Sequence, residues 1–476
     1  MKKLKIYILS LLMVGVSFSC EETLDINTDP LAATSADPNA VLPFVLVQYT
    51  ARKTTELGTR ITDVTAHMSQ NFNSPKLGNT TSFLTGNTWG MYYTDVLGNI
   101  QLVENDAKEL GPPSNNVAAI AIIIKSLAFY ELTSIWGDIP FSQASNGQEF
   151  PTPAFDDQET VLRGVVTLLD EAIALIDGMP DSGVFDVSTG DIIYGGDMSL
   201  WRRYANSLKL RVLMMIRNQD TSVDSEITAT LAQPLIENNA QAAFINYSGA
   251  PGQENGFWSL VNAFFGPSNE PLGVHQPSET IYDLLNSDND PRLNLFLINE
   301  DAGAPETGFN FESELAIYSD NVIRPDYPDV WFLPAEISFY RAELALKGVT
   351  GDDAQALYEQ GITQTLEFWG GDIPGVQLTL SSTEISDYIA GLPTLGSLST
   401  DEALAAVHNQ QYLETFLRPI VGWNHIRRTD VPAVPTPPGS DITTYLKRFT
   451  YPPDEIASNP NAPINPNTDV PQWFEN

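Results

Sequence analysis

The sequence predicts an all-α protein whose helices pair with their neighbours and whose long irregular loops separate the pairs. Three observations lead to this fold class. Apolar residues recur at helical spacing through most of the chain, as they do over 157–176. Strand-like alternation of apolar and polar residues is scarce and short, as in Gln241–Tyr247. Some consecutive helical segments are joined by only a few residues, which favours antiparallel neighbours.

The helical period defines a series of segments along the chain. The segment 89–110 ends at Gly111-Pro112-Pro113, a sequence that stops a helix. The segment 117–135 is almost entirely apolar, so we expect a helix that is buried on most of its sides. The predicted helices span 41–57, 89–110, 117–135, 157–176, 200–216, 223–238, 277–285, 334–347, 354–369, 383–391 and 401–417.

The helices expected at 334–347 and 354–369 form the clearest pair. The first carries small residues where two helices would approach closely, and the second carries large apolar residues opposite them. A unit of about 34 residues with this pattern is typical of a tetratricopeptide-like repeat, and a generic helical hairpin is the alternative. The small residues are Ala335, Ala342 and Ala345, and the large ones are Leu357, Tyr358, Ile362 and Leu366.

Between the helices lie long stretches with no helical period. They are rich in aromatic residues, Asn, Gly and Pro. Loops of this length are uncommon in compact domains unless they serve a function. These stretches are residues 70–88, 178–198, 247–276, 300–333 and 431–476.

The N-terminus has the layout of a lipoprotein signal peptide over residues 1–19. A basic start precedes the apolar run Ile6–Phe18, which is too short to cross a bilayer core of about 30 Å. Cys20 follows and is the only cysteine in the chain, so we expect cleavage before it and lipid on its sulfur. A plain secretory signal with an incidental cysteine is the alternative. Residues 20–40 are polar and are expected to form a tether.

The composition excludes several classes of partner and of stabilising bond. The 476-residue chain carries a formal net charge of −36, which repels phosphate backbones and anionic lipid, so we expect no nucleic-acid partner. With a single cysteine the chain forms no internal disulfide, and its stability must come from packing.

Motifs for catalysis or for metal binding are scarce. The sequence contains no phosphate-binding loop, no Gly-rich dinucleotide turn and no nucleophile elbow. Asp288-Asn289-Asp290 resembles the start of a calcium loop, but Arg292 follows where a ligand is needed, so a turn is the expected role. A pair of glycosidase carboxylates stays open as an alternative, although no feature selects one. Neither a metal nor a cofactor is expected from the four histidines, which lack ligand spacing: His67, His275, His408 and His425.

Aromatic residues in two loop regions suggest a site for a neutral glycan. Aromatic rings stack on the apolar faces of sugars, and amides bind the hydroxyl groups. Trp258 is the strongest candidate, because no helical period demands it; Trp89 and Tyr92 open a predicted helix and are weaker. The alternative is that these aromatic side chains only pack the loops against the helical core. The candidates are Trp258, Phe257, Phe264, Asn255, Asn262, Phe72, Asn73, Trp89 and Tyr92.

Six segments, in order along nearly the whole chain, resemble the SusD/RagB family and in particular its second, SusD-like branch. Any one of them is weak, whereas the series is specific. One departure is Pro334 at a position that is usually helical, which a first helical turn tolerates. The segments are Cys20 with 24–30, 134–141, 153–156 leading to 169–172, 201–211, 334–345, and 427–430 with 447–455.

The resemblance implies a fold, a location and a function. The fold is a superhelical scaffold of four tetratricopeptide-like pairs, with loops and extra helices covering one face, as a single domain over 41–476. A lipid such as palmitate on Cys20 would attach the protein to the outer membrane, facing the cell exterior, and Glu21 and Glu22 resemble a surface-export signal. The resemblance implies a non-catalytic lipoprotein that binds an oligosaccharide and delivers it to a TonB-dependent, SusC-like barrel; some relatives carry peptides instead.

Arginines in these segments are expected to support the scaffold. They lie on helices that the pattern places in the interior, where a guanidinium needs a carboxylate partner. We therefore expect ion pairs between repeats from Arg202, Arg203, Arg211, Arg427 and Arg428.

Overall fold

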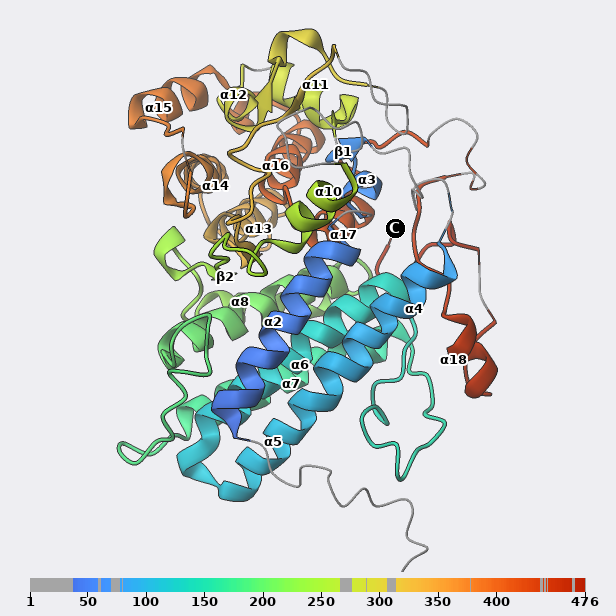
Figure 1. Cartoon of the computed structure of the whole chain (residues 1–476). Coiled ribbons are helices and arrows are strands. Elements are labelled where there is room, and N and C mark those ends of the chain that lie inside the picture. The colour runs from blue at the N-terminus through green and yellow to red at the C-terminus, as the bar shows by residue number, and fades with distance from the viewer. Residues whose placement is uncertain are drawn as a thin grey trace, which may run out of the picture. The chain divides into compact units, whose positions relative to one another are not determined.

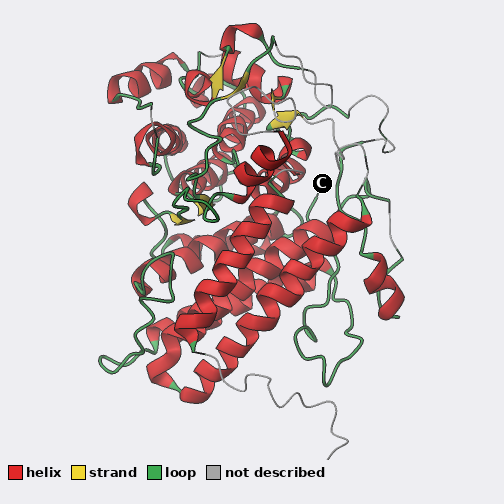
Figure 2. Ribbon diagram, in the orientation of Figure 1, coloured by secondary structure: helices red, strands yellow, loops and turns green. Residues whose placement is uncertain are grey.

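Helices make up most of the structure, which confirms the predicted all-α class (Figures 1 and 2). The computed structural model describes residues 37–476 except 59–60, 70–77, 79, 266–275, 288, 306–313, 377, 437–439, 441, 443, 465–466 and 476. Pro38–Asn476 folds as one compact unit, separate from Met1–Asp37. The expected signal peptide, Cys20 and nearly all of the expected tether therefore lie outside the described residues of that unit.

The first half of the unit is a set of long helices packed around α6 (Asn115–Trp136). Helix α6 contacts α5 and α7, and α7 contacts α8 (Figure 1). The helical stretch Pro112–Trp136 contains an 18-residue window that is apolar enough to span a membrane, yet 94% of that window is buried inside the protein, so it is the core helix that its sequence predicts. The other helices here are α2 (Pro38–Glu56), α3 (Ile61–Val64), α4 (Ser82–Gly90), α5 (Gly98–Leu110), α7 (Gln158–Asp177), α8 (Met198–Arg217) and α9 (Asp224–Leu231).

The second half carries shorter helices, and the described strands form only two-stranded antiparallel ladders. The pairs are β1 (Met68–Ser69) with β3 (Gln276–Pro277), β2 (Ala243–Ile245) with β6 (Asp329–Phe332), and β4 (Leu297–Ile298) with β5 (Ile317–Tyr318). The helices are α10 (Gly256–Phe265), α11 (Glu279–Ser287), α12 (Arg292–Phe296), α13 (Pro334–Leu346), α14 (Ala354–Glu367), α15 (Ser382–Gly391), α16 (Thr400–Glu414), α17 (Pro419–Thr429) and α18 (Pro453–Ser458).

The pair α13 and α14 packs as its sequence predicts. Pro334 occupies the first turn of α13, where a missing backbone N–H costs nothing. A Cβ atom on Gly361 of α14 would lie 2.6 Å from the ring of Phe339, so the two helices approach too closely for a larger residue there. Six of the seven residues predicted for this contact share one buried cluster, whereas Ala345 is half-buried and lies outside it. The six are Ala335, Ala342, Leu357, Tyr358, Ile362 and Leu366.

Several helix boundaries differ from the prediction, and each has a local cause. The helix expected over 223–238 ends at Leu231, before Pro234, because proline blocks the preceding turn. A helix starts at Ser82 instead of 89, and it continues through a π-helical segment, Met91–Leu97, into α5. Helices α10, α17 and α18 lie in stretches for which no helix was predicted.

A buried ion pair joins α8 of the first half to α13 of the second, and further buried pairs hold Arg418 and α17 to α13. Arg211 on α8 makes two hydrogen bonds to Glu336 on α13, at 2.6 and 2.8 Å, and Arg418 binds the same carboxylate at 2.9 Å. Arg428 on α17 binds Glu343 on α13 through both guanidinium ends, at 2.8 Å each. The predicted pairing of arginines is thus confirmed, and Arg202, Arg203 and Arg427 also lie within 4 Å of a carboxylate, at 3.2, 3.2 and 3.7 Å.

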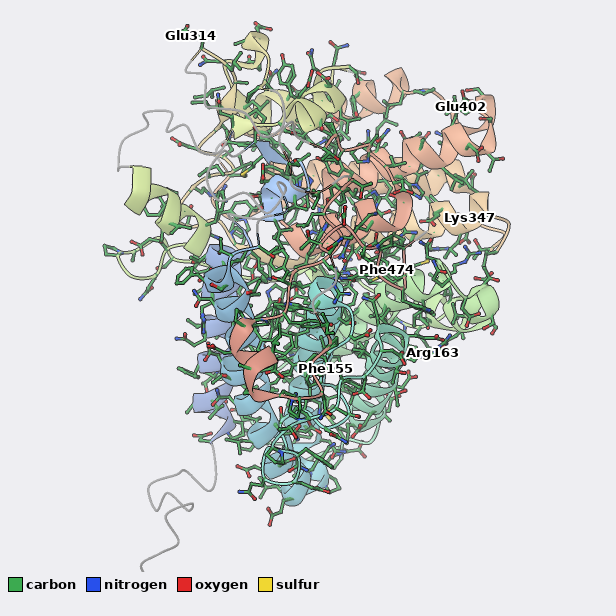
Figure 3. The ribbon with its side chains drawn as sticks, turned by 90° about the vertical axis from the view of Figure 1, so that its right-hand side faces the viewer. Phe155, Arg163, Glu314, Lys347, Glu402 and Phe474 are labelled. Atoms are coloured by element: carbon green, nitrogen blue, oxygen red, sulfur yellow. The ribbon has the colours of Figure 1, made fainter. Side chains whose placement is uncertain are left out.

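The C-terminal segment returns to this interior. Phe474 is fully buried, and the guanidinium of Arg427 lies 5.0 Å from the centre of its ring (Figure 3). The N–H groups of Arg427 donate to the carbonyls of Ser134 and Lys447 at 2.8 and 2.5 Å. One arginine therefore ties α6, α17 and the C-terminal segment together.

Replacement of Glu343 by Gln should destabilise the protein strongly. Glu343 is 0% exposed, and its carboxylate also accepts from Lys347 at 2.7 Å. Its loss would leave the buried Arg428 without a counter-charge, which typically costs about 3–5 kcal/mol. Urea unfolding of Glu343→Gln measures this loss. Glu109→Gln, at the exposed end of α5, should stay within about 0.5 kcal/mol of the parent. Equal stability of the two variants would contradict the assigned role.

The stability of the protein should depend on pH through Glu414. Burial, with Glu336 nearby, raises the pKa of Glu414 to about 8, although Arg418 opposes this shift. The folded protein then retains a proton that the unfolded chain releases above a pKa of about 4.3, so stability is lost as pH rises between these values.

Glu414→Gln removes this titration. The melting temperature of the variant relative to the parent should rise as pH increases from about 5 to about 8 and should then level off. Parallel melting curves for the parent and Glu414→Gln across this range would show that Glu414 is ionised in the folded protein. Glu109→Gln is the control, and its curve should parallel that of the parent.

Candidate functional site

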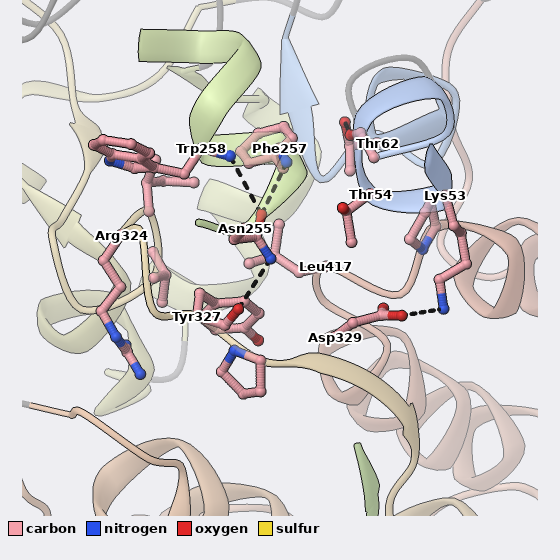
Figure 4. Close-up of a pocket in the computed structure, with 15 residues that line it drawn as sticks. Lys53, Thr54, Thr62, Asn255, Phe257, Trp258, Arg324, Tyr327, Asp329 and Leu417 are labelled. Carbon is pink, nitrogen blue, oxygen red and sulfur yellow. Dashed lines mark hydrogen bonds and ion pairs between the residues drawn. The ribbon is translucent and has the colours of Figure 1, made fainter. Parts of the chain in front are cut away.

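A surface cleft lies where the end of α2 meets the start of α10, the segment 322–329 and the segment 417–419 (Figure 4). The space that its walls enclose is small, about 30 Å³, and the rest of the cleft is open to solvent. Three of the sequence candidates line it, namely Asn255, Phe257 and Trp258. From Lys53 to Pro419, the cleft brings together residues that lie 366 positions apart in the sequence.

Asn255 fixes the start of α10, and both polar atoms of its side chain make hydrogen bonds. Its Oδ1 accepts from the backbone N–H groups of Phe257 and Trp258, at 2.9 and 3.3 Å. Its Nδ2 donates to the carbonyl of Tyr327 at 3.0 Å. Asn255 is thus the N-cap of α10, and it also links this helix to Tyr327 on the opposite side of the cleft. These bonds give Asn255 a structural role, and a contact of its amide with a ligand hydroxyl stays a prediction.

Trp258 and Phe257 differ in exposure. Phe257 is only 6% exposed and packs in the core beneath α10, whereas Trp258 is half-buried and borders the cleft. The argument that Trp258 lies in a stretch without helical structure was wrong, since both residues stand in the first turn of α10. Its partial exposure beside a cleft nevertheless leaves Trp258 as a ring that a ligand could reach.

A buried ion pair lies at the other end of the cleft from Trp258 (Figure 4). Lys53 Nζ on α2 lies 2.8 Å from Oδ2 of Asp329, and the two residues are 7% and 4% exposed. The same Oδ2 accepts from Trp331 Nε1 at 2.8 Å and from the hydroxyl of Thr50. Lys53 Nζ also lies 4.9 Å from the ring centre of Tyr49. These contacts hold both charges in place without a ligand.

Tyr327 forms part of the wall between these two ends. It is 5% exposed, and its hydroxyl has no hydrogen-bond partner among the described residues. Its ring stacks on Trp369 at 5.8 Å, and burial raises the pKa of its hydroxyl. A buried hydroxyl without a partner costs free energy, so the group is available for a ligand or a water molecule.

Trp89 and Tyr92 are packing residues, which corrects their place among the ligand candidates. Trp89 is 9% exposed and meets the ring of Trp136 edge-on at 5.0 Å. Tyr92 is fully buried, and its hydroxyl donates to Glu131 at 2.7 Å. Neither ring has a free face for a ligand, because their helices surround α6.

The remaining candidates fall in other places. Asn262 lies on α10 and does not line the cleft. Phe264 also lies on α10, and its side chain is outside the described residues. Phe72 and Asn73 lie outside them as well, as does His275.

Within the described ranges, no group of three His, Cys, Asp or Glu residues could hold a metal ion. Asp290 is taken up by Arg292 and by the hydroxyl of Tyr388 at 2.7 Å, which agrees with the structural role expected for this turn. His408 and His425, which are distant in sequence, do meet, with ring centres 5.8 Å apart. Burial lowers the pKa of both rings, so both are neutral packing groups at pH 7.

Sequence reasoning missed the polar residues of the cleft, among them Lys53, Arg324, Tyr327 and Asp329. Tyr327 and Asp329 lie within the stretch 300–333, whose length had marked it as a functional loop. The alternation Pro325-Asp326-Tyr327-Pro328-Asp329 was a signal that could have drawn attention to it. Lys53 gave no signal, because it stands among other polar residues at the end of a helix.

Fold and cleft together define a helical binding protein, and comparison with known proteins identifies its family. A family model described as starch-binding associating with outer membrane matches residues 33–452. The chain therefore belongs to this SusD-like family, which confirms the resemblance seen in the sequence. Proteins of this family bind their ligands without transforming them, so the chain is a binding protein and not an enzyme.

Solved structures share the fold at low sequence identity. A chitin-binding protein is 20% identical with a TM-score of 0.79, and the match covers 92% of this chain and 100% of that chain. A SusD-like protein from Bacteroides thetaiotaomicron is 20% identical with a TM-score of 0.77, covering 92% and 99%. A chitin-binding SusD homologue from Flavobacterium johnsoniae is 19% identical with a TM-score of 0.76, covering 92% and 98%. No curated protein matches the sequence significantly.

Proposed function

We propose that the protein is a cell-surface lipoprotein that captures an oligosaccharide in the cleft beside Trp258 and delivers it to a TonB-dependent, SusC-like barrel. The observation that carries the proposal is the half-buried ring of Trp258 beside fixed polar groups, in a chain of a family described as starch-binding. A sugar ring presents apolar C–H faces and a rim of hydroxyl groups. An indole face next to hydrogen-bonding side chains complements both features.

Two further facts support a glycan as the ligand. Two of the solved relatives are described as chitin-binding, and chitin, like starch, is a polymer of hexose units. The charged residues that line the cleft are Lys53, Arg324 and Asp329. Lys53 pairs with Asp329 at 2.8 Å and Arg324 with Asp326 at 2.9 Å, so each cation already has a counter-charge and none is left to attract a strongly ionic ligand. A neutral, hydroxyl-rich molecule fits these conditions.

The proposal includes anchoring through Cys20 and a barrel partner. A signal peptide over 1–19 with its cysteine at the cleavage point, and the family's association with the outer membrane, support the anchor. The barrel partner rests on the family resemblance. Co-purification of a TonB-dependent barrel with the tagged protein from solubilised outer membranes tests it. Recovery of the protein without any barrel contradicts this part of the proposal.

Trp258→Ala should weaken glycan binding about tenfold or more, because a stacked aromatic ring is worth about 1–3 kcal/mol. Isothermal titration with a panel of oligosaccharides and peptides measures the effect and identifies the ligand class. The melting temperature should stay close to that of the parent. The matched control is Trp473→Ala, which removes another half-buried tryptophan that does not line the cleft.

Three results would count against the site or the function. Unchanged binding by Trp258→Ala, or its unfolding, would make Trp258 a packing residue. Binding of peptides in the absence of glycan binding would assign the protein to the peptide-carrying branch of its relatives. Release of shorter products from a bound glycan would contradict a role in capture alone.

Cys20→Ala should release the protein from the membrane or leave its signal peptide uncleaved, because the acyl chains have no other attachment point. Labelling with radioactive palmitate, followed by membrane fractionation, measures both outcomes. Thr23→Ala, in the expected tether, is the control and should stay membrane-bound. Retention of an unlabelled Cys20→Ala variant in the outer membrane would show that another element anchors the chain.

A further inference from the structure

Three large apolar side chains are exposed on the first half of α2 and on α5. Phe44 and Val47 on α2 are 51% and 48% exposed, and Leu102 on α5 is 49% exposed. Single exposed apolar residues are ordinary on a protein surface, whereas a contiguous group marks a site of interaction. The register of the two helices decides whether these three side chains form such a group.

Helices α2 and α5 contact each other and run in opposite directions (Figure 1). The ion pair between Arg52 and Asp95 sets their register. Phe44 lies eight residues before Arg52 and Leu102 lies seven residues after Asp95, which is about two helical turns in each case. The two side chains therefore come to the same height on neighbouring helices. Together with Val47, one turn further along α2 than Phe44, they form a surface that we call the α2–α5 face.

The α2–α5 face is free of charge in a strongly acidic chain. Residues 38–51 contain no charged side chain, and neither do residues 96–103, although the whole chain carries a formal net charge of −36. Depletion of charge around apolar side chains is typical of the core of a protein interface. A helix that lies on a membrane surface carries Lys or Arg on its polar side, which residues 38–51 lack. A second copy is disfavoured, because two chains of this charge repel each other. The face therefore fits a different protein.

The face adjoins the cleft along α2. Val47 and Thr54 are seven residues apart, so both emerge on the same side of the helix, and Thr54 lines the cleft. Helix α10 covers α2 between them, since a Cβ atom on Gly256 would lie 2.5 Å from the carbonyl oxygen of Ala51. The uncovered part of α2 begins where this cover ends. A partner on the face would thus be about 10 Å along the helix from a ligand in the cleft.

From these observations we propose that the TonB-dependent barrel docks on the α2–α5 face, with Phe44, Val47 and Leu102 at the centre of the contact. The inference rests on the proposed function, which supplies the barrel and the lipid on Cys20. Seventeen residues, 21–37, separate that cysteine from the start of α2, and a chain of this length spans at most about 60 Å. The face lies within the first three turns of α2, so the anchor keeps it within reach of a partner in the membrane.

Co-purification from solubilised outer membranes measures the contact. Phe44→Ser combined with Leu102→Ser should lower the molar ratio of barrel to tagged protein about tenfold or more, because a few apolar anchors carry most of the energy of an interface. Quantitative mass spectrometry identifies the barrel and gives the ratio. The matched control is Phe83→Ser, which removes a 66% exposed phenylalanine at the start of α4 and should recover the barrel like the parent. Both variants should keep the melting temperature and the oligosaccharide binding of the parent, since they change exposed side chains outside the cleft.

A cross-link tests the face without removing Phe44 or Leu102. Val47→Cys, labelled with a photoactivatable benzophenone, should form a covalent adduct with the barrel, because its side chain lies at the centre of the proposed contact. Phe83→Cys with the same label should form none. Cys20 is the only other cysteine, and lipid occupies its sulfur in the anchored protein, so the label reaches one position. This measurement decides the question if the double variant fails to fold.

The outcomes separate the docking surface from the proposed function. Parent-like recovery of the barrel by the folded double variant, or no adduct from labelled Val47→Cys, overturns the α2–α5 face while the barrel partner stands. A dimer of the Cys20→Ala protein that the two serine substitutions dissociate would assign the face to a second copy and overturn the proposal. Binding of that protein to phosphatidylcholine vesicles, lost in the same way, would overturn it in favour of a lipid surface. Absence of any barrel from the parent preparation contradicts the proposed partner and this inference with it.

Discussion

The arrangement of the other elements depends on the two ion pairs that the carboxylate of Glu336 makes. It receives Arg211 from α8 and Arg418 from the segment before α17, and it is fully buried on α13. Burial alone would raise the pKa of Glu336, but the two guanidinium groups outweigh this and lower it. One ionised group therefore connects the long helices of the first half to the helical pair of the second half, at a point from which water is excluded.

The position of the cleft follows from this connection. Arg211, while bound to Glu336, also donates to the carbonyl of Trp331, and so it fixes β6 beside α8. Asp329 stands two residues earlier on β6 and meets Lys53 of α2. A buried ion pair is often no more stabilising than a well-packed apolar contact. What a guanidinium–carboxylate pair adds is direction, because its planar, two-bond geometry permits only a narrow range of orientations between the elements that it joins.

The sequence predicted those parts of the fold that local patterns determine. These parts are the helix at 157–176, the buried helix α6 and the packing of α13 against α14. Each depends on residues that are close together in the sequence. The end of α9 was misjudged and α10 was missed altogether, because Pro234 and the cap at Asn255 act through single residues that a period does not reveal. Trp258 was selected on an argument about missing periodicity that was wrong, although the residue does border the cleft. Trp89 and Tyr92 looked alike in sequence, and only the packing of α4 and the following π-helical segment around α6 shows that both are buried.

The polar end of the cleft was beyond any local pattern, since Lys53 and Asp329 are far apart in the sequence and meet only when β6 docks on α2. Because the two ends of the cleft come from different parts of the sequence, they are held in place by different contacts. The polar end consists of side chains that the core already binds, so their positions are fixed by the fold itself. The rim is the first turn of α10, which Asn255 holds by capping the helix and by donating to the carbonyl of Tyr327. Changes in the first turn of α10 can thus alter the rim while the polar end of the cleft keeps its geometry, because the contacts that fix Asp329 do not involve α10.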